Sequence, residues 1–164
     1  MRDILFKAKA INRDDDNGCY RTSYKNGDWV YGLVTKLFDD RFENCPAAMK
    51  NTDGVSGIEV DHNTICQYTG QNDRHYYKIF ENDIVRTIVD DMTMLVRWDN
   101  ENSKYVLDDY SSDGILMDTY EFGDFLNRDL EIIGNVFDNR NLIGPLPDDE
   151  ISRLFDKLYL EYKD

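Results

Sequence analysis

The chain has 164 residues, with 33 Asp or Glu against 19 Lys or Arg, which gives a formal net charge of −14. Nonspecific attraction to nucleic acid needs cationic side chains that displace counterions from phosphates, so this balance argues against direct nucleic-acid binding. No apolar run approaches the ~18 residues of a membrane-spanning helix, and the opening residues lack the apolar core of a signal peptide.

Apolar and polar side chains alternate over residues 4–10, which predicts an opening strand with one buried face. Alternation returns over residues 20–24 and ends at Asn26-Gly27, a pair that suits the type I′ turn of a hairpin. Residues 29–34 then predict the return strand. Residues 39–57 are polar and contain proline and glycine, so we expect a loop there.

The second half of the chain carries further strand patterns. Residues 78–85 place a turn between two apolar pairs, and residues 84–89 predict a strand. We expect Asn82 to have a positive φ, because asparagine is the least penalised replacement for glycine in such turns. Residues 94–107 predict a second hairpin with a polar loop at 99–103, and residues 130–137 predict a last strand.

Two aromatic residues and one charge pattern add to these expectations. Trp29 and Trp98 lie in strand segments beside apolar neighbours, so we expect them in the core or just under its surface. Residues 99–131 hold ten acidic and two basic side chains, which leaves a net charge of −8 in this part of the chain. The acidity is therefore concentrated in the second half, where it serves solubility or imitates the phosphate rows of DNA.

The end of the chain predicts an amphipathic helix over residues 147–162. Pro147-Asp148-Asp149-Glu150 suits a helix start, and one stripe is apolar at helical spacing. A helix of this length is marginal alone in water, so the stripe should pack either on the chain's own barrel or on a second subunit. The stripe consists of Ile151, Leu154, Phe155 and Leu158.

Three groups of residues are of types that could bear chemistry, and none of them supports a catalytic, cofactor or metal site. His62, Cys66 and His75 contain one pair at zinc-ligand spacing but lack a second pair; we expect a strand cysteine and two surface histidines. The odd, widely spaced cysteines indicate free thiols in a reducing compartment. Adjacent acids arise by chance in so acidic a chain. The cysteines are Cys19, Cys45 and Cys66, and the acidic pairs are Asp39-Asp40, Asp90-Asp91 and Asp108-Asp109.

Several blocks of the sequence, in order, resemble the YopX family of bacteriophages and prophages. The resemblance begins at Met1-Arg2-Asp3-Ile4-Leu5-Phe6-Lys7-Ala8 and Trp29-Val30-Tyr31-Gly32. Its most specific pair is Cys66-Gln67-Tyr68-Thr69-Gly70 and Ile79-Phe80-Glu81-Asn82-Asp83-Ile84-Val85. Asn82 stands where that family usually has glycine, and the helix at 147–162 lies beyond the family's usual end. The tail of the resemblance is Val96-Arg97-Trp98-Asp99, Tyr105-Val106-Leu107 and Leu130-Glu131-Ile132-Ile133-Gly134-Asn135-Val136-Phe137.

The resemblance implies a mainly β (α+β) fold that contains an SH3-like barrel, with a domain over residues 1–140 and a linker and C-terminal helix over 141–164. It implies no activity. We expect a phage or prophage accessory protein of the bacterial host cytoplasm that acts as a non-enzymatic protein-interaction module, itself able to form a homo-oligomer. Two alternatives stay open: an acidic, DNA-mimicking inhibitor of a host DNA-binding protein or nuclease, and an enzyme of unrecognised type. Neither nucleic-acid nor membrane binding is expected, and the protein partner stays open.

Overall fold

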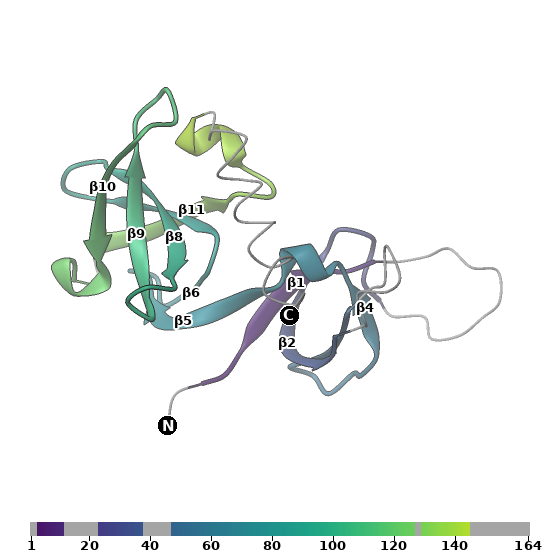
Figure 1. Cartoon of the computed structure of the whole chain (residues 1–164). Helices are drawn as coiled ribbons and strands as arrows, with labels where there is room; N and C mark the ends of the chain where they lie inside the picture. Colours follow the sequence, from purple (N-terminus) through teal and green to yellow (C-terminus); the bar gives the residue numbers. More distant parts are fainter. Residues whose placement is uncertain (1–2, 12–22, 38–46, 127–128, 145–164) are drawn as a thin grey trace. The chain divides into compact units, whose positions relative to one another are not determined.

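The computed structural model describes residues 3–11, 23–37, 47–126 and 129–144 (Figure 1). These residues form two antiparallel sheets with short 3-10 helices, so the predicted mainly β fold is confirmed. The chain divides into two compact units, Met1–Tyr68 and Thr69–Asp164. The predicted helix at 147–162, with its apolar stripe, lies outside the described residues, and the division into 1–140 and 141–164 stays a prediction.

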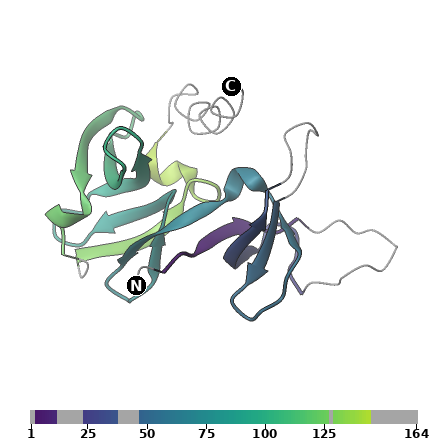
Figure 2. The same ribbon diagram turned by 60° about the horizontal axis from the view of Figure 1, so that its bottom comes forward.

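The first unit is an antiparallel sheet in the order β4-β3-β2-β1-β5, coloured purple to blue in Figure 2. Strand β5 extends beyond Tyr68 into the second unit and pairs with β6 (Lys78–Phe80), which ends the order of this sheet. The elements are β1 (Phe6–Lys9), β2 (Trp29–Lys36), β3 (Ala47–Asn51), β4 (Ile58–Val60), the 3-10 helix η1 (His62–Thr64) and β5 (Cys66–Asn72).

The opening strand is confirmed as β1, with Ala8 fully buried in the core of the first unit. Ile4 lies before the strand and is 66% exposed, so the buried face begins later than the alternation predicted. The core joins small and branched side chains from four strands. Its members are Ala8, Ala10, Val30, Ala47, Met49, Ile58 and Val60.

Two local predictions for the first unit are wrong. Strand β2 pairs with β1 and β3, and the turn before it has a positive φ at Gly27 (87°) but not at Asn26, so it is not a type I′ turn. This turn closes by a bond from Asp28 N to Lys25 O (3.1 Å). The expected loop contains strand β3, because its alternate side chains are buried between β2 and β4.

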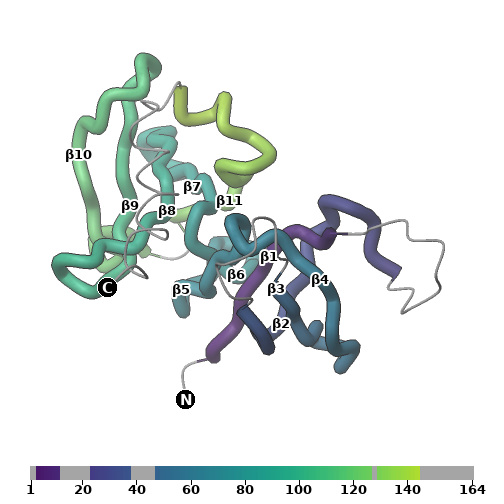
Figure 3. Tube along the Cα trace, turned by 45° about the vertical axis from the view of Figure 1, so that its right-hand side comes forward, coloured from purple at the N-terminus to yellow at the C-terminus, as the bar shows by residue number. Residues whose placement is uncertain are grey.

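The second unit contains an antiparallel sheet in the order β10-β9-β8-β7-β11. Figure 3 shows β7, β8 and β9 side by side. The predicted second hairpin is confirmed as β8 and β9, and the predicted last strand as β11. The elements are β6 (Lys78–Phe80), β7 (Asp83–Thr87), β8 (Thr93–Asp99), β9 (Lys104–Tyr110), β10 (Leu116–Glu121), η2 (Phe122–Asp124), β11 (Leu130–Asn135) and η4 (Arg140–Ile143).

Both faces of this second sheet carry apolar clusters, because successive side chains of a strand point to opposite faces. One cluster contains Met94 and Val96 of β8 with Leu107 of β9. The other contains Ile84 and Leu95, over which Ile143 of η4 packs. The hairpin β8–β9 therefore lies between two small cores.

Three residues singled out in the sequence have definite positions. Asn82 has the expected positive φ of 64°; its N–H donates to Val96 O (2.8 Å), and its carbonyl accepts from Val136 N (3.1 Å). Trp29 and Trp98 are half-buried and belong to neither unit's buried clusters. They therefore lie just under the surface, the shallower of the two positions expected.

Candidate interaction surface

The three residues weighed as metal ligands differ in their surroundings. His62 is exposed in η1, whereas Cys66 is fully buried in β5 and its Sγ donates to Thr64 O (3.4 Å). His75 Nε2 lies 3.5 Å from Glu131 Oε1. Among the described residues, no three His, Cys, Asp or Glu side chains gather as metal ligands would. Cys19 and Cys45 lie outside the described residues.

The acidic pairs of the sequence do not form paired carboxylates where the structure describes them. Asp108 and Asp109 are neighbours on β9, so their side chains point to opposite faces of the sheet. Asp91 lies in an exposed turn with a φ of 54°, and Arg86 Nε lies 3.5 Å from its Oδ1. The pair at 39–40 lies outside the described residues.

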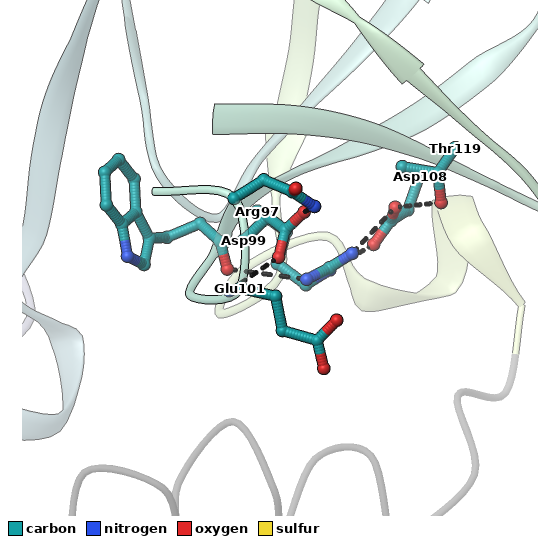
Figure 4. Close-up of polar contacts among 7 residues, drawn as sticks. Arg97, Asp99, Glu101, Asp108 and Thr119 are labelled. Atoms are coloured by element: carbon teal, nitrogen blue, oxygen red, sulfur yellow. Dashed lines mark hydrogen bonds and ion pairs between the residues drawn. The ribbon is translucent and has the colours of Figure 1, made fainter. Parts of the chain in front are cut away.

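Asp108 is instead the buried centre of a partly buried polar network (Figure 4). Its side chain is 1% exposed and accepts from Nε and Nη2 of Arg97 (Nη2 to Oδ1, 3.2 Å). Thr119 Oγ1 donates to the same Oδ1 (2.8 Å). The hydrogen bond and the charge of Asp108 raise the pKa of Arg97. This network joins β8, β9 and β10 on one face and holds the edge strand in register.

The charge of the chain is divided very unequally between the two units. The first unit has nine Lys or Arg and eleven Asp or Glu, which gives a net charge of −2. The second unit has ten Lys or Arg and twenty-two Asp or Glu, which gives a net charge of −12. The acidity is therefore a property of the second unit. Such a field attracts cationic partners and repels polyanions.

The hairpin of β9 and β10 displays apolar side chains within this acidic surface. Its turn is held by bonds from Ser111 N to Ile115 O (2.9 Å) and from Gly114 N to Ser111 O (2.9 Å). Three consecutive side chains then lie open to solvent. We call them the β10 patch: Ile115 (62% exposed), Leu116 (42%) and Met117 (64%).

Acidic side chains flank the β10 patch. Asp113 precedes it in the turn, Asp118 follows it, and both are exposed. Further along β10, Glu121 pairs with Lys104, which raises the pKa of that lysine. Partial burial and the carboxylates of Asp118 and Asp109 raise the pKa of Tyr120. The exposed apolar side chains of this segment are thus preceded and followed along the chain by acidic ones.

Strand β10 and its patch were not predicted from the sequence. The segment Leu116–Glu121 has no clear alternation, because the pairing with β9 shifts register between Leu116 and Asp118. Such a bulge breaks the period-two pattern that identifies a strand. The one usable signal was the concentration of acidic residues over 99–131, which includes this strand.

The fold and this surface define a class: a mainly β protein of two compact units, one of them strongly acidic. The family model described as YopX protein matches residues 11–144, more than four-fifths of the chain. The chain therefore belongs to the YopX family, which confirms the resemblance found in the sequence. No curated protein shows significant similarity to this sequence. Within the described residues, no helix has the length and apolar character needed to cross a membrane.

Proposed function

We propose that this YopX-family protein is a non-enzymatic protein-interaction module of phage or prophage origin that acts in the bacterial host cytoplasm. In this proposal the second unit is an SH3-like barrel, which the five-stranded antiparallel order and the 3-10 helix after β10 support. Its partner is a protein that presents apolar side chains among Lys and Arg. The fold alone does not decide a function, so the proposal depends on the β10 patch.

The single observation that carries the proposal is the exposure of three consecutive large apolar side chains, Ile115, Leu116 and Met117. Removing apolar surface from water is the main driving force of protein association, and contiguous apolar patches with polar rims mark interaction sites. The carboxylates of Asp113 and Asp118 at the rim favour encounter with a cationic surface, because complementary charge raises the association rate.

The chain's own C-terminal residues and a second copy are weaker candidates for this patch. Residues 145–164 carry six acidic and three basic side chains, a net charge of −3, which opposes docking beside the acidic rim. A second copy would bring another unit of net charge −12 against the first. Like charges at an interface cost free energy, so a separate cationic protein fits better.

A capture experiment with matched variants tests the proposal. The full chain is immobilised beside the double variant Ile115→Asp/Met117→Asp, and host lysate is passed over both at low and at high salt. The control is Val89→Asp, which places one aspartate, against two in the double variant, at an apolar side chain that is 80% exposed in a turn of the same unit. Captured proteins are identified and their affinities measured with purified components.

We expect at least one protein to bind the parent and Val89→Asp chains and to lose about tenfold or more in affinity for the double variant, which corresponds to about 1.4 kcal/mol. Part of the binding should survive high salt, since apolar contacts are not screened. A set of bound proteins that is the same for all three chains would refute a role for the β10 patch.

An acidic inhibitor of a host DNA-binding protein or nuclease is the second candidate function. The observation in its favour is the net charge of −12 in the second unit. Here binding depends on charge rather than on the patch. A captured nuclease or polymerase that leaves in high salt, competes with duplex DNA and binds the Ile115→Asp/Met117→Asp variant unchanged would favour this function.

A further inference from the structure

The two edges of the five-stranded sheet are closed in different ways. At the β11 edge, Ile132 N donates to Asp73 Oδ2 (3.3 Å) and Leu130 O accepts from Arg74 N (2.8 Å). Asp73 is only 3% exposed and also accepts from the N–H groups of His75 (2.8 Å) and Tyr77 (2.9 Å). A loop distant in sequence therefore covers this edge with buried, interlocked bonds.

At the β10 edge, exposed carboxylates of β10 and of the following helix η2 accept hydrogen bonds from the backbone donors. Thr119 N donates to Asp118 Oδ1 (2.8 Å), and Glu121 N donates to Asp124 Oδ2 (2.8 Å). These N–H groups are two residues apart and so point to the same side of the strand. In the described part of the chain, β10 ends the sheet order and pairs only with β9 (Figures 1 and 3).

The carboxylates of Asp118 on β10 and Asp124 in η2 can leave without disturbing a core, because both are exposed and bond to near neighbours in the sequence. Asp118 bonds to the Tyr120 side chain as well as to Thr119 N, and the bond of Asp124 to Glu121 N belongs to the capping box of η2. A Lys or Arg beside either carboxylate would draw it away from the backbone. The N–H of Thr119 or Glu121 could then donate to the carbonyl of an added strand. Asp73 has no such freedom, since its burial and its three N–H donors hold it in place.

We propose that β10 accepts an extended segment rich in Lys or Arg as an additional antiparallel strand, with Asp118 and Asp124 as displaceable caps. This inference rests on the proposed function and adds the binding mode and the chemistry of the partner segment. Main-chain bonds supply affinity in strand addition, and alternate side chains supply specificity. One set of the added strand's side chains would contact the β10 patch, and its cations would meet the flanking carboxylates.

The acidic side chains of β10 itself also disfavour pairing of this edge with a second copy. Antiparallel pairing of two β10 strands would bring Asp118 and Glu121 of one copy near the same acids of the other. Like charges directly opposite each other destabilise a strand pair, and charged side chains are a usual protection of exposed edges. The edge is thus closed to a second copy of this chain but open to a cationic segment.

Amide hydrogen exchange on the full chain tests strand addition. The probe is a capped six-residue peptide of alternating Lys and Val, compared with its Glu and Val counterpart and with a version N-methylated at every second residue. We expect the Lys peptide to slow exchange at the amides of Thr119 and Glu121 by about tenfold or more, as stable backbone bonds do. The amide of Ile132 is the internal reference and should not change.

The control peptides and one pair of substitutions sharpen the expected result. The Glu peptide should not bind, and N-methylation should lower affinity by about tenfold or more, because it removes the donors that β10 carbonyls need. The variant Asp118→Asn/Asp124→Asn keeps oxygen acceptors for both N–H groups but removes both charges. It should fold normally and bind the Lys peptide more weakly.

Three results would overturn the inference. The first is an absence of binding by the Lys peptide at low salt. The second is binding without protection of Thr119 and Glu121, or without sensitivity to N-methylation; if Ile115→Asp/Met117→Asp still weakens a captured partner, the proposed function survives while strand addition fails. The third is an affinity that rises in the full-length Phe155→Asp variant, which would show that the chain's own C-terminal residues hold this edge.

Discussion

The guanidinium of Arg97 donates two hydrogen bonds to the carboxylate of Asp108, whose side chain is 1% exposed while that of Arg97 is 31% exposed. Planar two-point pairing of this kind holds both side chains in one geometry. It connects β8 to β9, and Thr119 extends it to β10. The edge strand that carries the β10 patch is therefore positioned from the interior of the hairpin.

Removing Arg97 should destabilise the second unit strongly. Arg97→Met leaves a buried carboxylate with Thr119 as its remaining side-chain donor, and we expect the free energy of unfolding to fall by about 3 kcal/mol, the lower end for a broken buried pair. The free energy of unfolding should fall less in the double variant Arg97→Met/Asp108→Leu, because no charge is left buried there. Chemical denaturation measures both. Lys104→Met, which removes an exposed pair with Glu121, should change little. A double variant no more stable than Arg97→Met would contradict this account.

Among the loop acids that the structure describes in the second unit, Asp73 should be the most sensitive to substitution, because it is buried. Asp73→Ala removes the acceptor of three backbone N–H groups, those of His75, Tyr77 and Ile132. Leaving buried donors unpaired should cost about 3 kcal/mol or more in total. Asp90→Ala, in an exposed turn, is the matched control and should stay within about 0.5 kcal/mol. Equal melting temperatures for the two variants would show that the loop does not secure the β11 edge.

Substitutions of Asn82 test whether its positive φ is the reason for an asparagine at this position. Because its φ is 64°, Asn82→Ala should lower the free energy of unfolding by about 1 kcal/mol or less. Both residues have a Cβ, but asparagine enters the left-handed region more readily than alanine. Asn82→Gly should stay close to the parent, since glycine takes this φ freely. Thermal unfolding of the parent, Asn82→Ala and Asn82→Gly chains measures these differences. If alanine and glycine destabilise equally, a side-chain bond of Asn82 matters more than its backbone angle.

Gly32 tests the packing of the first unit. It lies opposite Phe6 on β1 and Asn51 on β3, and an added Cβ would come within 1.9 Å of Lys50 O. We expect Gly32→Ala to cost at least about 3 kcal/mol, as severe overpacking does. Gly123→Ala is the control, because nothing lies within 4 Å of its added Cβ and its φ is not positive. If the Gly32→Ala chain has the same free energy of unfolding as the parent, β2 and β3 move apart easily to accommodate the added Cβ.

Asp99 should contribute to the pH dependence of stability. Its pKa is lowered in the folded chain, chiefly by the hydrogen bond from Asn102 Nδ2 (2.7 Å). The folded state therefore binds this proton more weakly than the unfolded state, so the stabilisation is present above the ordinary pKa of about 3.9 and is lost as pH falls below it. Melting temperatures of the parent and Asp99→Asn chains should converge as the pH drops through this range, whereas Asp90→Asn should follow the parent. If the difference in melting temperature between the parent and Asp99→Asn chains does not change with pH, the lowered pKa of Asp99 does not contribute to the pH dependence of stability.

The sequence by itself determined the strands whose apolar pattern is local. Alternation identified β1, and apolar segments next to polar turns identified β8, β9 and β11. The family blocks identified the YopX membership, and the turn around Asn82 predicted its positive φ. Each of these depends on neighbouring residues. Composition also located the acidity in the second half of the chain. These features need no knowledge of what lies across a sheet.

Only the tertiary structure decided which residues form pairs and edges. Strand β3 was expected as a loop, and β10 was not predicted, since one gains its burial from β2 and β4 and the other is bulged and exposed. The adjacent acids Asp108 and Asp109 differ in role because a strand turns them to opposite faces. The different caps at Asp73 and Asp118 follow from contacts over 59 residues in one case and one residue in the other. Long-range pairing decides where a backbone edge is left exposed, and local sequence patterns do not record it.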